Sequence, residues 1–231
     1  AWEARPGIYW TSETNLDWVS ASLELIKAFY DNGGLRAVAA GSCAEYDWTA
    51  GGVLSELTSP AKPSTLYGTA KLGCAQMMHA FALQKKASFS WGRVFFTFGP
   101  YEYPQRLVPT VIQSLLKGEI AHTSSGEQIR DFLYIEEVGR ALVELLDSKV
   151  EGPVNIGSGK GVRISDMLDT LGLSIGRQNL IEKRAIPIAP NEPPVLVADV
   201  TRLIKEVGFK QKVSLLEGLE KTVQWWQARI N

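Results

Sequence analysis

The chain has 231 residues, of which 45% are apolar, so it can bury a sizeable core and is not an intrinsically disordered protein. Lys and Arg number 24 against 25 Asp and Glu, a net charge of -1, and no long run of either sign offers a footprint for duplex nucleic acid or an anionic membrane. The 2 Cys and 2 His form neither a disulfide framework nor a zinc motif, and neither a leader peptide nor an apolar run of roughly 20 residues is seen, so we expect a soluble, cytoplasmic protein with reduced thiols.

An amphipathic helix is the first regular element that the sequence predicts. Asn15 can cap it, apolar residues follow at spacings of three and four, and Asn32-Gly33-Gly34 can end it. A short apolar strand over 37–40 comes next and runs into the small polar residues of 41–46. Because buried parallel strands deliver functional groups at their C-terminal ends, this junction is a candidate site. Residues 47–64, rich in Gly, Ser, Thr and Pro, are predicted to form a surface loop.

The second predicted helix carries a tyrosine and a lysine one turn apart. Ser64 or Thr65 can cap this helix, which continues to Lys86. Residues i and i+4 project from the same helix face, so the ammonium of Lys71 can lie beside the phenol of Tyr67. A cation there lowers the tyrosine pKa from its usual value of about 10, as a general acid or base requires. Taken alone, the pair is more simply explained by a solvated helix face.

Strands and helices continue to alternate through the rest of the chain. We predict a strand over 88–98 closed by Gly99-Pro100, a helix over 109–117, a segment over 130–135, a helix from Glu136 or Glu137 to about Ser148, a strand over 154–159, a helix over 165–171, a short helix from Asp199 or Thr201 to Val207, and a last helix over 215–230. The four prolines of residues 187–194 exclude a helix or a central strand there. The alternation predicts an α/β fold with a mostly parallel sheet.

Six motifs follow one another along the chain: Gly41-Ser42-Cys43-Ala44-Glu45-Tyr46, Tyr67-Gly-Thr-Ala-Lys71, Arg93-Val-Phe-Phe-Thr-Phe-Gly99-Pro100, Arg130-Asp131-Phe132, Asn155-Ile156-Gly157-Ser158-Gly159 and Ala198-Asp199. In this order, and over nearly the whole length, they resemble the extended short-chain dehydrogenase/reductase family, the NAD(P)-dependent epimerases and dehydratases of nucleotide sugars. The resemblance implies a doubly wound parallel, Rossmann-like sheet that here lacks its first strands. Residues 1–98 and 132–158 then belong to a dinucleotide-binding domain, and 99–131 and 159–231 to a smaller α/β substrate-binding region.

The resemblance also implies a catalytic triad of Ser42, Tyr67 and Lys71 that works with NAD or NADP. Tyr67 would exchange a proton with a sugar hydroxyl as hydride passes to or from the nicotinamide, and Ser42 would hydrogen-bond the same oxygen. Lys71 would hold the nicotinamide ribose and keep the tyrosine acidic, so Tyr67 and Lys71 are also predicted cofactor contacts. For Ser42 the alternative is a plain cap or turn hydroxyl.

The substrate that the resemblance implies is a nucleoside-diphosphate sugar. Arg130 would grip its diphosphate, a task suited to a permanently charged, forked donor; the alternative is a salt bridge to Asp131. Leu107 and Val108 would line the nucleotide pocket, or else belong to the core. By the same resemblance the chain forms a homodimer, through a four-helix interface made by its first two helices.

Two departures from the family pattern bear on the reaction. Family 4,6-dehydratases carry an acidic pair directly after the catalytic hydroxyl, where Cys43 and Ala44 stand here, so dehydration is disfavoured. Phe96 replaces the usual asparagine before Gly-Pro, and the usual arginine is missing from residues 187–194. We therefore predict a 4-epimerase or ketoreductase of nucleotide sugars with Cys43 and Phe96 at the substrate, and keep a family member acting on a non-nucleotide ketone or aldehyde as an alternative.

The largest departure lies at the start of the chain. The glycine-rich turn that seats the cofactor pyrophosphate on a helix N-terminus is absent there, and residues 157–159 come too late in the chain to supply it. We favour a fragment of a complete enzyme, because loss of the central strands exposes a sheet edge and apolar faces. The alternative is a shortened, non-catalytic relative that still binds sugar nucleotides.

Overall fold

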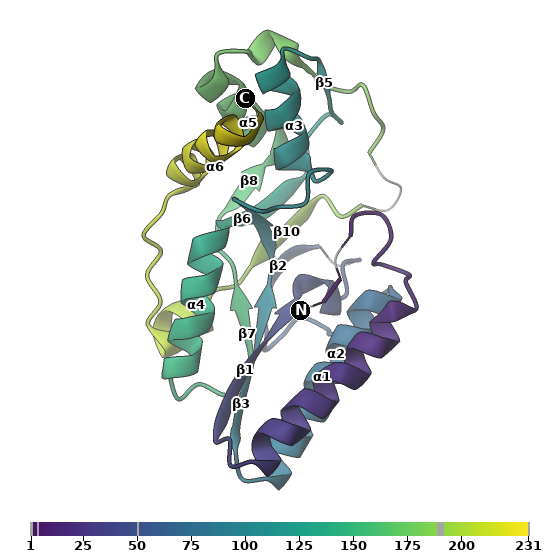
Figure 1. Ribbon diagram of the computed structural model, residues 1–231, viewed down its shortest axis with the longest axis vertical. Helices are drawn as coiled ribbons and strands as arrows, with labels where there is room; N and C mark the ends of the chain where they lie inside the picture. The colour runs from purple at the N-terminus through teal and green to yellow at the C-terminus, as the bar shows by residue number, and fades with distance from the viewer. Residues whose placement is uncertain (1, 4, 50, 189–191, 231) are drawn as a thin grey trace.

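The computed structural model describes residues 2–3, 5–49, 51–188 and 192–230, in which strands and helices alternate (Figure 1). The helices are α1 (Thr14–Asp31), α2 (Leu66–Gln84), α3 (Leu107–Lys117), α4 (Ile135–Asp147), α5 (Ile164–Ile175) and α6 (Leu215–Ile230), with short turns η1 (Cys43–Glu45), η2 (Gln178–Leu180) and η3 (Leu203–Val207). The strands are β1 (Arg36–Ser42), β2 (Gly52–Leu54), β3 (Ser88–Val94), β4 (Phe96–Phe98), β5 (Ala121–His122), β6 (Ile129–Tyr134), β7 (Gly152–Ile156), β8 (Gly161–Arg163), β9 (Ile181–Glu182) and β10 (Val195–Ala198). The predicted α/β class is confirmed, and none of the described helices combines the length and apolarity that a membrane crossing requires.

The first sheet has the order β1-β3-β7, and all of its strands are parallel. Side chains alternate along β1: Val38 packs into the apolar cluster of α4, whereas Ala37 and Ala39 pack into the cluster of α1 and α2. Figure 1 shows α4 on one side of this sheet and α1 with α2 on the other. The sheet is therefore doubly wound, as predicted, with apolar clusters on both of its faces.

The second sheet has the order β2-β10-β6-β4, with β8 antiparallel to β6. The helices α3, α5 and α6 bury one apolar cluster together with the aromatic residues of β4 and β6. Gly218 lets α6 come close to these strands, because an added Cβ would lie 2.9 Å from the ring of Phe98 and 3.1 Å from that of Tyr134. This packing fixes the position of α3, whose first residues line the pocket described below.

Two predicted segments pair differently from expectation. Residues 52–54, predicted as loop, form β2 because β10 pairs with them from late in the chain. The single strand expected over 88–98 divides at Phe95, whose N–H donates to the carbonyl of Ile156 at 3.0 Å. β3 then pairs with β7 in the first sheet, and β4 with β6 in the second. Thus β2 and β4, which lie within 1–98, join the second sheet.

The first helix begins differently from the prediction. Asn15 is not its cap; it lies in the first turn of α1 and is buried. Its Nδ2 donates to the carbonyls of Tyr9 and Ser12, both at 2.8 Å, and its Oδ1 accepts from Nε1 of Trp2 at 2.9 Å. Asn15 therefore holds the N-terminal segment against the helix, a role that capping preferences do not predict.

Three further predicted segments, a helix, a strand and the proline-rich stretch, can be compared with the structure. The helix expected to stop near residue 171 continues to Ile175, where Gly176 takes the left-handed conformation (φ 73) that ends a helix. The strand expected over 154–159 ends before its glycines, with β7. In the proline segment, residues 187–188 and 192–194 are neither helix nor strand, as predicted, and 189–191 lie outside the described residues.

Asp131 of β6 ties the second sheet to the loop that follows β7. Its carboxylate is fully buried, and Oδ1 accepts from the N–H (2.7 Å) and hydroxyl (2.6 Å) of Ser158. Oδ2 accepts from the N–H groups of Gly159 (2.9 Å) and Ala198 (3.1 Å). Four donors compensate a charge that is costly to bury. Asp131 thereby fixes the backbone beside the pocket.

Candidate active site

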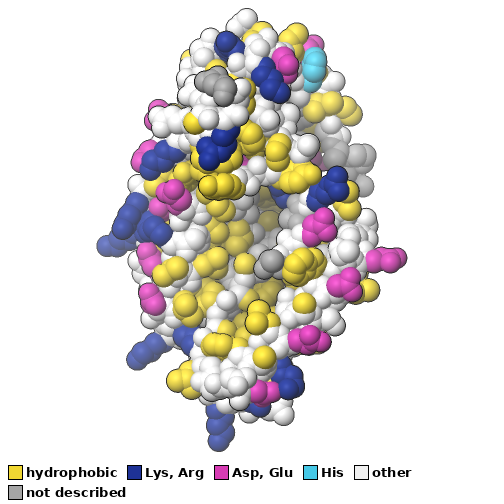
Figure 2. Space-filling view, in the orientation of Figure 1, with side chains coloured by type: hydrophobic (Ala, Val, Ile, Leu, Met, Phe, Trp, Pro, Cys, Tyr) yellow, Lys and Arg dark blue, Asp and Glu magenta, His cyan; other side chains and the backbone are white. Residues whose placement is uncertain are grey.

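A pocket of about 790 Å³ opens where the N-terminal segment meets the ends of both sheets. Figure 2 shows a hollow near the middle of the face that is turned to the viewer, with hydrophobic side chains gathered in it. Seven residues predicted for catalysis or substrate binding line the pocket: Ser42, Cys43, Tyr67, Phe96, Leu107, Val108 and Arg130. Lys71 does not; it lines a second pocket of about 570 Å³ beside β1. The fold thus gathers most of the predicted site, while the individual roles stay predictions.

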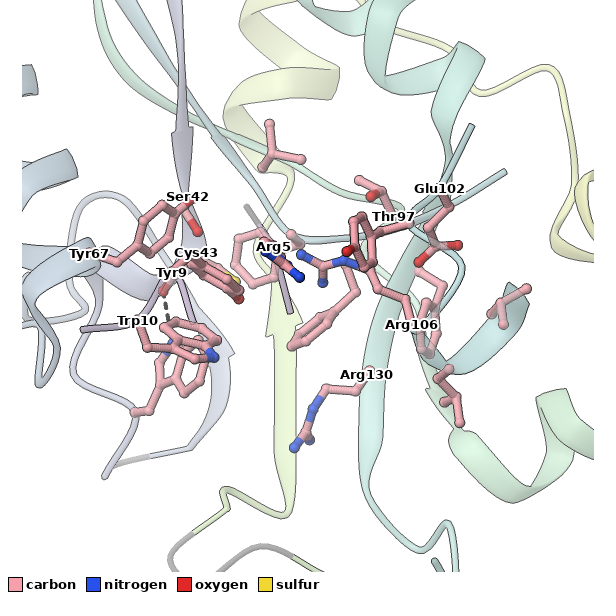
Figure 3. A pocket seen from close by; sticks show the side chains of 18 of the residues that line it. Arg5, Tyr9, Trp10, Ser42, Cys43, Tyr67, Thr97, Glu102, Arg106 and Arg130 are labelled. Atoms are coloured by element: carbon pink, nitrogen blue, oxygen red, sulfur yellow. Dashed lines mark hydrogen bonds between the residues drawn. The ribbon is translucent and has the colours of Figure 1, made fainter. Parts of the chain in front are cut away.

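Ser42 is the last residue of β1 and caps the short turn η1. Its Oγ accepts the N–H of Ala44 at 3.2 Å, and its side chain lies close enough to the Tyr67 hydroxyl to oppose the rise that burial causes in the pKa of that phenol. Figure 3 shows Ser42 and Tyr67 together on one wall of the pocket. The cap hydroxyl considered as the alternative is therefore present, and it coexists with the contact to the tyrosine.

Glu45 fixes the turn that presents Ser42. Its carboxylate is fully buried: Oε1 accepts from the N–H of Ser42 (2.7 Å) and Nε1 of Trp91 (2.8 Å), and Oε2 from Nε of Arg93 (2.9 Å). Only glycine fits at position 41, because an added Cβ would lie 2.5 Å from the Glu45 Oε1 atom. The ion pair of Glu45 with Arg93 joins η1, the turn that follows β1, to β3 beside the serine. The sequence motif contained Glu45, but no pattern indicated its partners.

Tyr67 lies in the first turn of α2, which Thr65 caps by accepting the N–H of Gly68 at 3.1 Å. Its ring packs edge-on against Tyr9 and Trp10, with centroid distances of 4.8 and 5.7 Å. Burial raises the pKa of Tyr67, and the hydrogen bond with Ser42 opposes that shift. The expected lowering of this pKa is therefore wrong for this conformation, in which the neutral phenol is favoured.

Lys71 turns away from the ligand pocket. Its Nζ donates to the carbonyl of Ala40 at 2.9 Å and lies 4.0 Å from the ring centroid of Trp2, compared with 6.0 Å from that of Tyr67. Burial lowers the pKa of Lys71 to about 8, and the charge of Glu45 opposes this shift. Spacing on the helix correctly placed the two side chains as neighbours, but the ammonium interacts with a carbonyl and an indole instead of the phenol.

A dinucleotide cofactor fits the described residues only in part. Tyr67 and Lys71 flank β1 and could contact a nicotinamide ribose. The pyrophosphate, however, requires a glycine-rich turn between a strand and a helix N-terminus. Within the part of the chain that the structure describes, β1 is the edge of its sheet, with no strand on its far side to lead into such a turn. The described residues thus offer no seat for the pyrophosphate, and contact of Tyr67 and Lys71 with a nicotinamide ribose stays a prediction.

Arg130 lies at the start of β6 and is 3% exposed. Its guanidinium donates to its neighbour's carbonyl, that of Ile129, at 2.9 Å and to Oε1 of Glu192 at 2.7 Å, and lies 5.4 Å from the ring of Phe96. The alternative of a salt bridge to Asp131 is wrong, because that carboxylate is occupied by backbone and serine donors. A buried, permanently charged group at the pocket wall is suited to an anionic ligand.

Sequence reasoning missed several residues of the pocket: Arg5, Tyr9, Trp10, Glu102 and Arg106. Three of them come from the N-terminal segment, which carries no periodic pattern and so gave no structural signal. Burial raises the pKa of Tyr9 to about 12, and the guanidinium of Arg106 lies 5.8 Å from its ring. The available signal for Arg106 was its position directly before Leu107.

Comparison with protein families and curated proteins shows clear relatives. The sequence model of the NAD dependent epimerase/dehydratase family matches residues 4–157. A dTDP-glucose 4,6-dehydratase of Escherichia coli is 26% identical over 182 residues, covering 75% of this chain and 50% of the enzyme. UDP-glucuronic acid decarboxylase 1 of Xenopus tropicalis is 28% identical over 178 residues, covering 74% and 41%. The chain thus spans about half the length of the curated relatives it matches.

Solved structures share the fold. The UDP-N-acetylglucosamine 4-epimerase of Methanobrevibacter ruminantium, in complex with UDP-N-acetylmuramic acid, superposes with a TM-score of 0.86 at 24% identity, covering 93% of this chain and 70% of that one. MoeE5, in complex with UDP-glucuronic acid and NAD, gives a TM-score of 0.78 at 27% identity, covering 90% and 70%. The Rossmann-like arrangement of this chain is therefore the one seen in these complexes.

Lys71 should make the free energy of unfolding depend on pH above about 8. Because its folded-state pKa of about 8 lies below the usual lysine value of 10.5, the unfolded chain binds more protons between these values, and stability rises with pH there. We expect urea unfolding to show the wild type gaining stability relative to Lys71→Met across this window. Lys62→Met, at an exposed loop position, serves as the control. A wild-type advantage that is constant with pH would contradict the lowered pKa.

Proposed function

The chain belongs to the NAD dependent epimerase/dehydratase family, and we propose that it carries the substrate site of a nucleotide-sugar 4-epimerase or ketoreductase in which Ser42 and Tyr67 exchange a proton with a sugar hydroxyl. The observation that supports this most directly is that the Ser42–Tyr67 pair and the buried guanidinium of Arg130 share one pocket. A proton-transfer pair and an anion-binding group suit a substrate with a reacting hydroxyl and a diphosphate.

Tyr67 is the group that transfers the proton in this proposal. Ser42, which lies beside the Tyr67 hydroxyl, offers a second donor at the oxygen where charge develops. Because burial favours the neutral phenol, Tyr67 is set to donate a proton to a ketone oxygen. The opposite step needs a nearby cation, and Lys71, with Nζ 6.0 Å from the tyrosine ring, is the one on the same helix face.

The remaining pocket residues define the substrate class. Arg130 binds the diphosphate, and its contact with Glu192 holds the guanidinium in place until the ligand arrives. Aromatic side chains of the pocket, Trp10 and Phe96 among them, offer faces on which a nucleoside base can stack. The pair after Ser42, Cys43 and Ala44, has no carboxylate, so epimerisation or ketone reduction is favoured over dehydration.

NAD or NADP supplies the hydride acceptor or donor when bound, and Tyr67 with Lys71 contacts its nicotinamide ribose. A second candidate function, a non-catalytic protein that binds sugar nucleotides, is favoured by one observation. The ammonium of Lys71 contacts the carbonyl of Ala40 and the ring of Trp2, whereas in a working cofactor site it would contact the nicotinamide ribose. The third candidate, a non-nucleotide ketone or aldehyde as substrate, predicts no affinity for a nucleoside diphosphate.

Replacing Arg130 tests the substrate class. We expect Arg130→Gln to weaken binding of UDP-glucose or dTDP-glucose by about 10-fold or more, the usual loss for a hydrogen bond to a charged group. Isothermal titration calorimetry measures the affinities. Arg229→Gln removes the same charge from α6, where the guanidinium stacks on Trp225, and should leave binding unchanged. If no nucleoside-diphosphate sugar binds the wild type, the alternative of a non-nucleotide substrate is favoured instead.

Replacing Tyr67 separates catalysis from binding. We expect Tyr67→Phe to lower turnover of the bound nucleotide sugar by about 100-fold or more, since general acid–base catalysis contributes at least that much. Calorimetric affinity for the sugar nucleotide should stay within about 3-fold of wild type, because the phenyl ring keeps its packing against Tyr9. Both proteins are assayed with the glycine-rich cofactor segment in place; turnover retained by the variant sinks the assignment, and a wild type that then binds without any turnover points to the non-catalytic candidate.

A homodimer built on α1 and α2 is the predicted assembly. These helices pack on each other and leave large apolar side chains exposed, among them Leu16 (59%) and Met77 (45%). Exposed apolar side chains on paired helices are suited to a four-helix interface. Sedimentation velocity should give twice the chain mass of 25.4 kDa, and the Leu16→Glu and Met77→Glu double variant should give that mass once. A wild type that sediments as a monomer refutes the dimer.

A further inference from the structure

Glu102 is a carboxylate of the pocket that neither the sequence motifs nor the proposed reaction uses. It lies in the loop between β4 and α3 and is partly buried. Figure 3 shows it with Thr97 and Arg106, across the pocket from Ser42 and Tyr67. Its Oε2 atom is buried and finds no hydrogen-bond partner in the described part of the chain.

The unsatisfied oxygen distinguishes Glu102 from the fully buried carboxylates of this chain. Glu45 and Asp131 accept three and four hydrogen bonds respectively. Glu137, 1% exposed, accepts from Nη1 of Arg140 on one oxygen and from the N–H of Lys212 on the other. The chain thus supplies donors where a carboxylate only supports the fold. At Glu102 one oxygen is left for a donor from elsewhere, and the pocket is the space beside it.

Burial of the Glu102 carboxylate also changes its acidity. Burial raises the pKa of Glu102 to about 7, against the opposing effects of the Arg106 charge and a backbone hydrogen bond from Gly99. A buried acceptor without a donor loses the hydrogen bonds that water would provide, so a ligand group that donates to Oε2 recovers them on binding. The arrangement therefore favours a bound molecule with a hydrogen-bond donor at this position.

We propose that Glu102 is a specificity-determining contact, whose carboxylate turns its Oε2 toward the pocket and accepts there a hydrogen bond from a hydroxyl group of the bound nucleotide sugar. This inference rests on the proposed function, and it extends that function to the wall opposite the Ser42–Tyr67 pair. The hydroxyl belongs either to the ribose of the nucleotide or to the sugar. The arginines that line the same pocket, Arg5, Arg106 and Arg130, serve the anionic part of the ligand and leave the hydroxyl to the carboxylate.

A pH dependence of known sign follows from this contact. A hydroxyl donor favours the ionised carboxylate, so affinity rises as the pH is raised through about 7 and a proton is released on binding. The other charged side chains that line the pocket are Glu3, Arg5, Arg106, Arg130 and Glu192, and its other titratable groups are Tyr9, Cys43, Tyr67 and Tyr103. Of the charged groups, Arg106 acts on Glu102 directly.

Calorimetric titration of the wild type and Glu102→Gln with UDP-glucose, and separately with UDP, tests the contact. At about pH 8 we expect Glu102→Gln to bind UDP-glucose about 5-fold or more weakly, and at about pH 6 the two proteins to converge. The direction of the change in affinity is informative. If charge alone acts, removing a negative charge near the diphosphate strengthens binding, whereas loss of the hydrogen bond weakens it. A loss shared by UDP assigns the ribose hydroxyl, and a loss confined to UDP-glucose assigns the sugar.

Glu119→Gln, which removes a carboxylate from an exposed position after α3 and outside the pocket, is the matched control and should bind like the wild type. Equal or tighter binding by Glu102→Gln at about pH 8, with both ligands, overturns the proposal while leaving the proposed function intact. A wild type that binds neither UDP nor UDP-glucose overturns both together.

Discussion

The site depends on one buried carboxylate, that of Glu45. Through it the last residue of β1 is tied to two residues of β3, so Ser42 cannot move without losing its hydrogen bond to a carboxylate that a buried ion pair with Arg93 holds in place. Removing one partner of such a pair leaves an uncompensated buried charge. Ser42 is therefore held by the sheet itself rather than by the flexible part of a loop, which suits the role proposed for it at the substrate oxygen.

The N-terminal segment has a larger part in the site than its lack of pattern suggests. Asn15 anchors it to α1, Tyr9 and Trp10 surround the ring of Tyr67, and Trp2 covers the ammonium of Lys71. The same short segment thus touches both pockets. Whatever binds beside β1 has to share or replace the indole of Trp2, so occupancy of one pocket is physically linked to the packing of the other.

The sequence predicted what local periodicity and motif order determine. The alternation of elements follows from short-range patterns, and the placing of Ser42 and Tyr67 in one site was implied by the order of the motifs that resemble a known family. Long-range pairings escaped prediction: β2 exists only because β10 pairs with it, and Arg130 finds its partner Glu192 at a separation of 62 residues. Spacing placed Lys71 on the correct helix face, but which acceptor its flexible side chain reaches depends on tertiary contacts.

The pairing of β2 with β10 also sets an order of events during synthesis. Leu54 of β2 is 2% exposed in the finished fold, where it packs with Cys43 against Leu196 and Ala198. Ribosomes add about 5–20 residues per second, so on the order of 10 s passes between the emergence of these two strands. During that time Leu54 lacks the apolar partners that β10 supplies, and a polypeptide that stops before β10 never buries it.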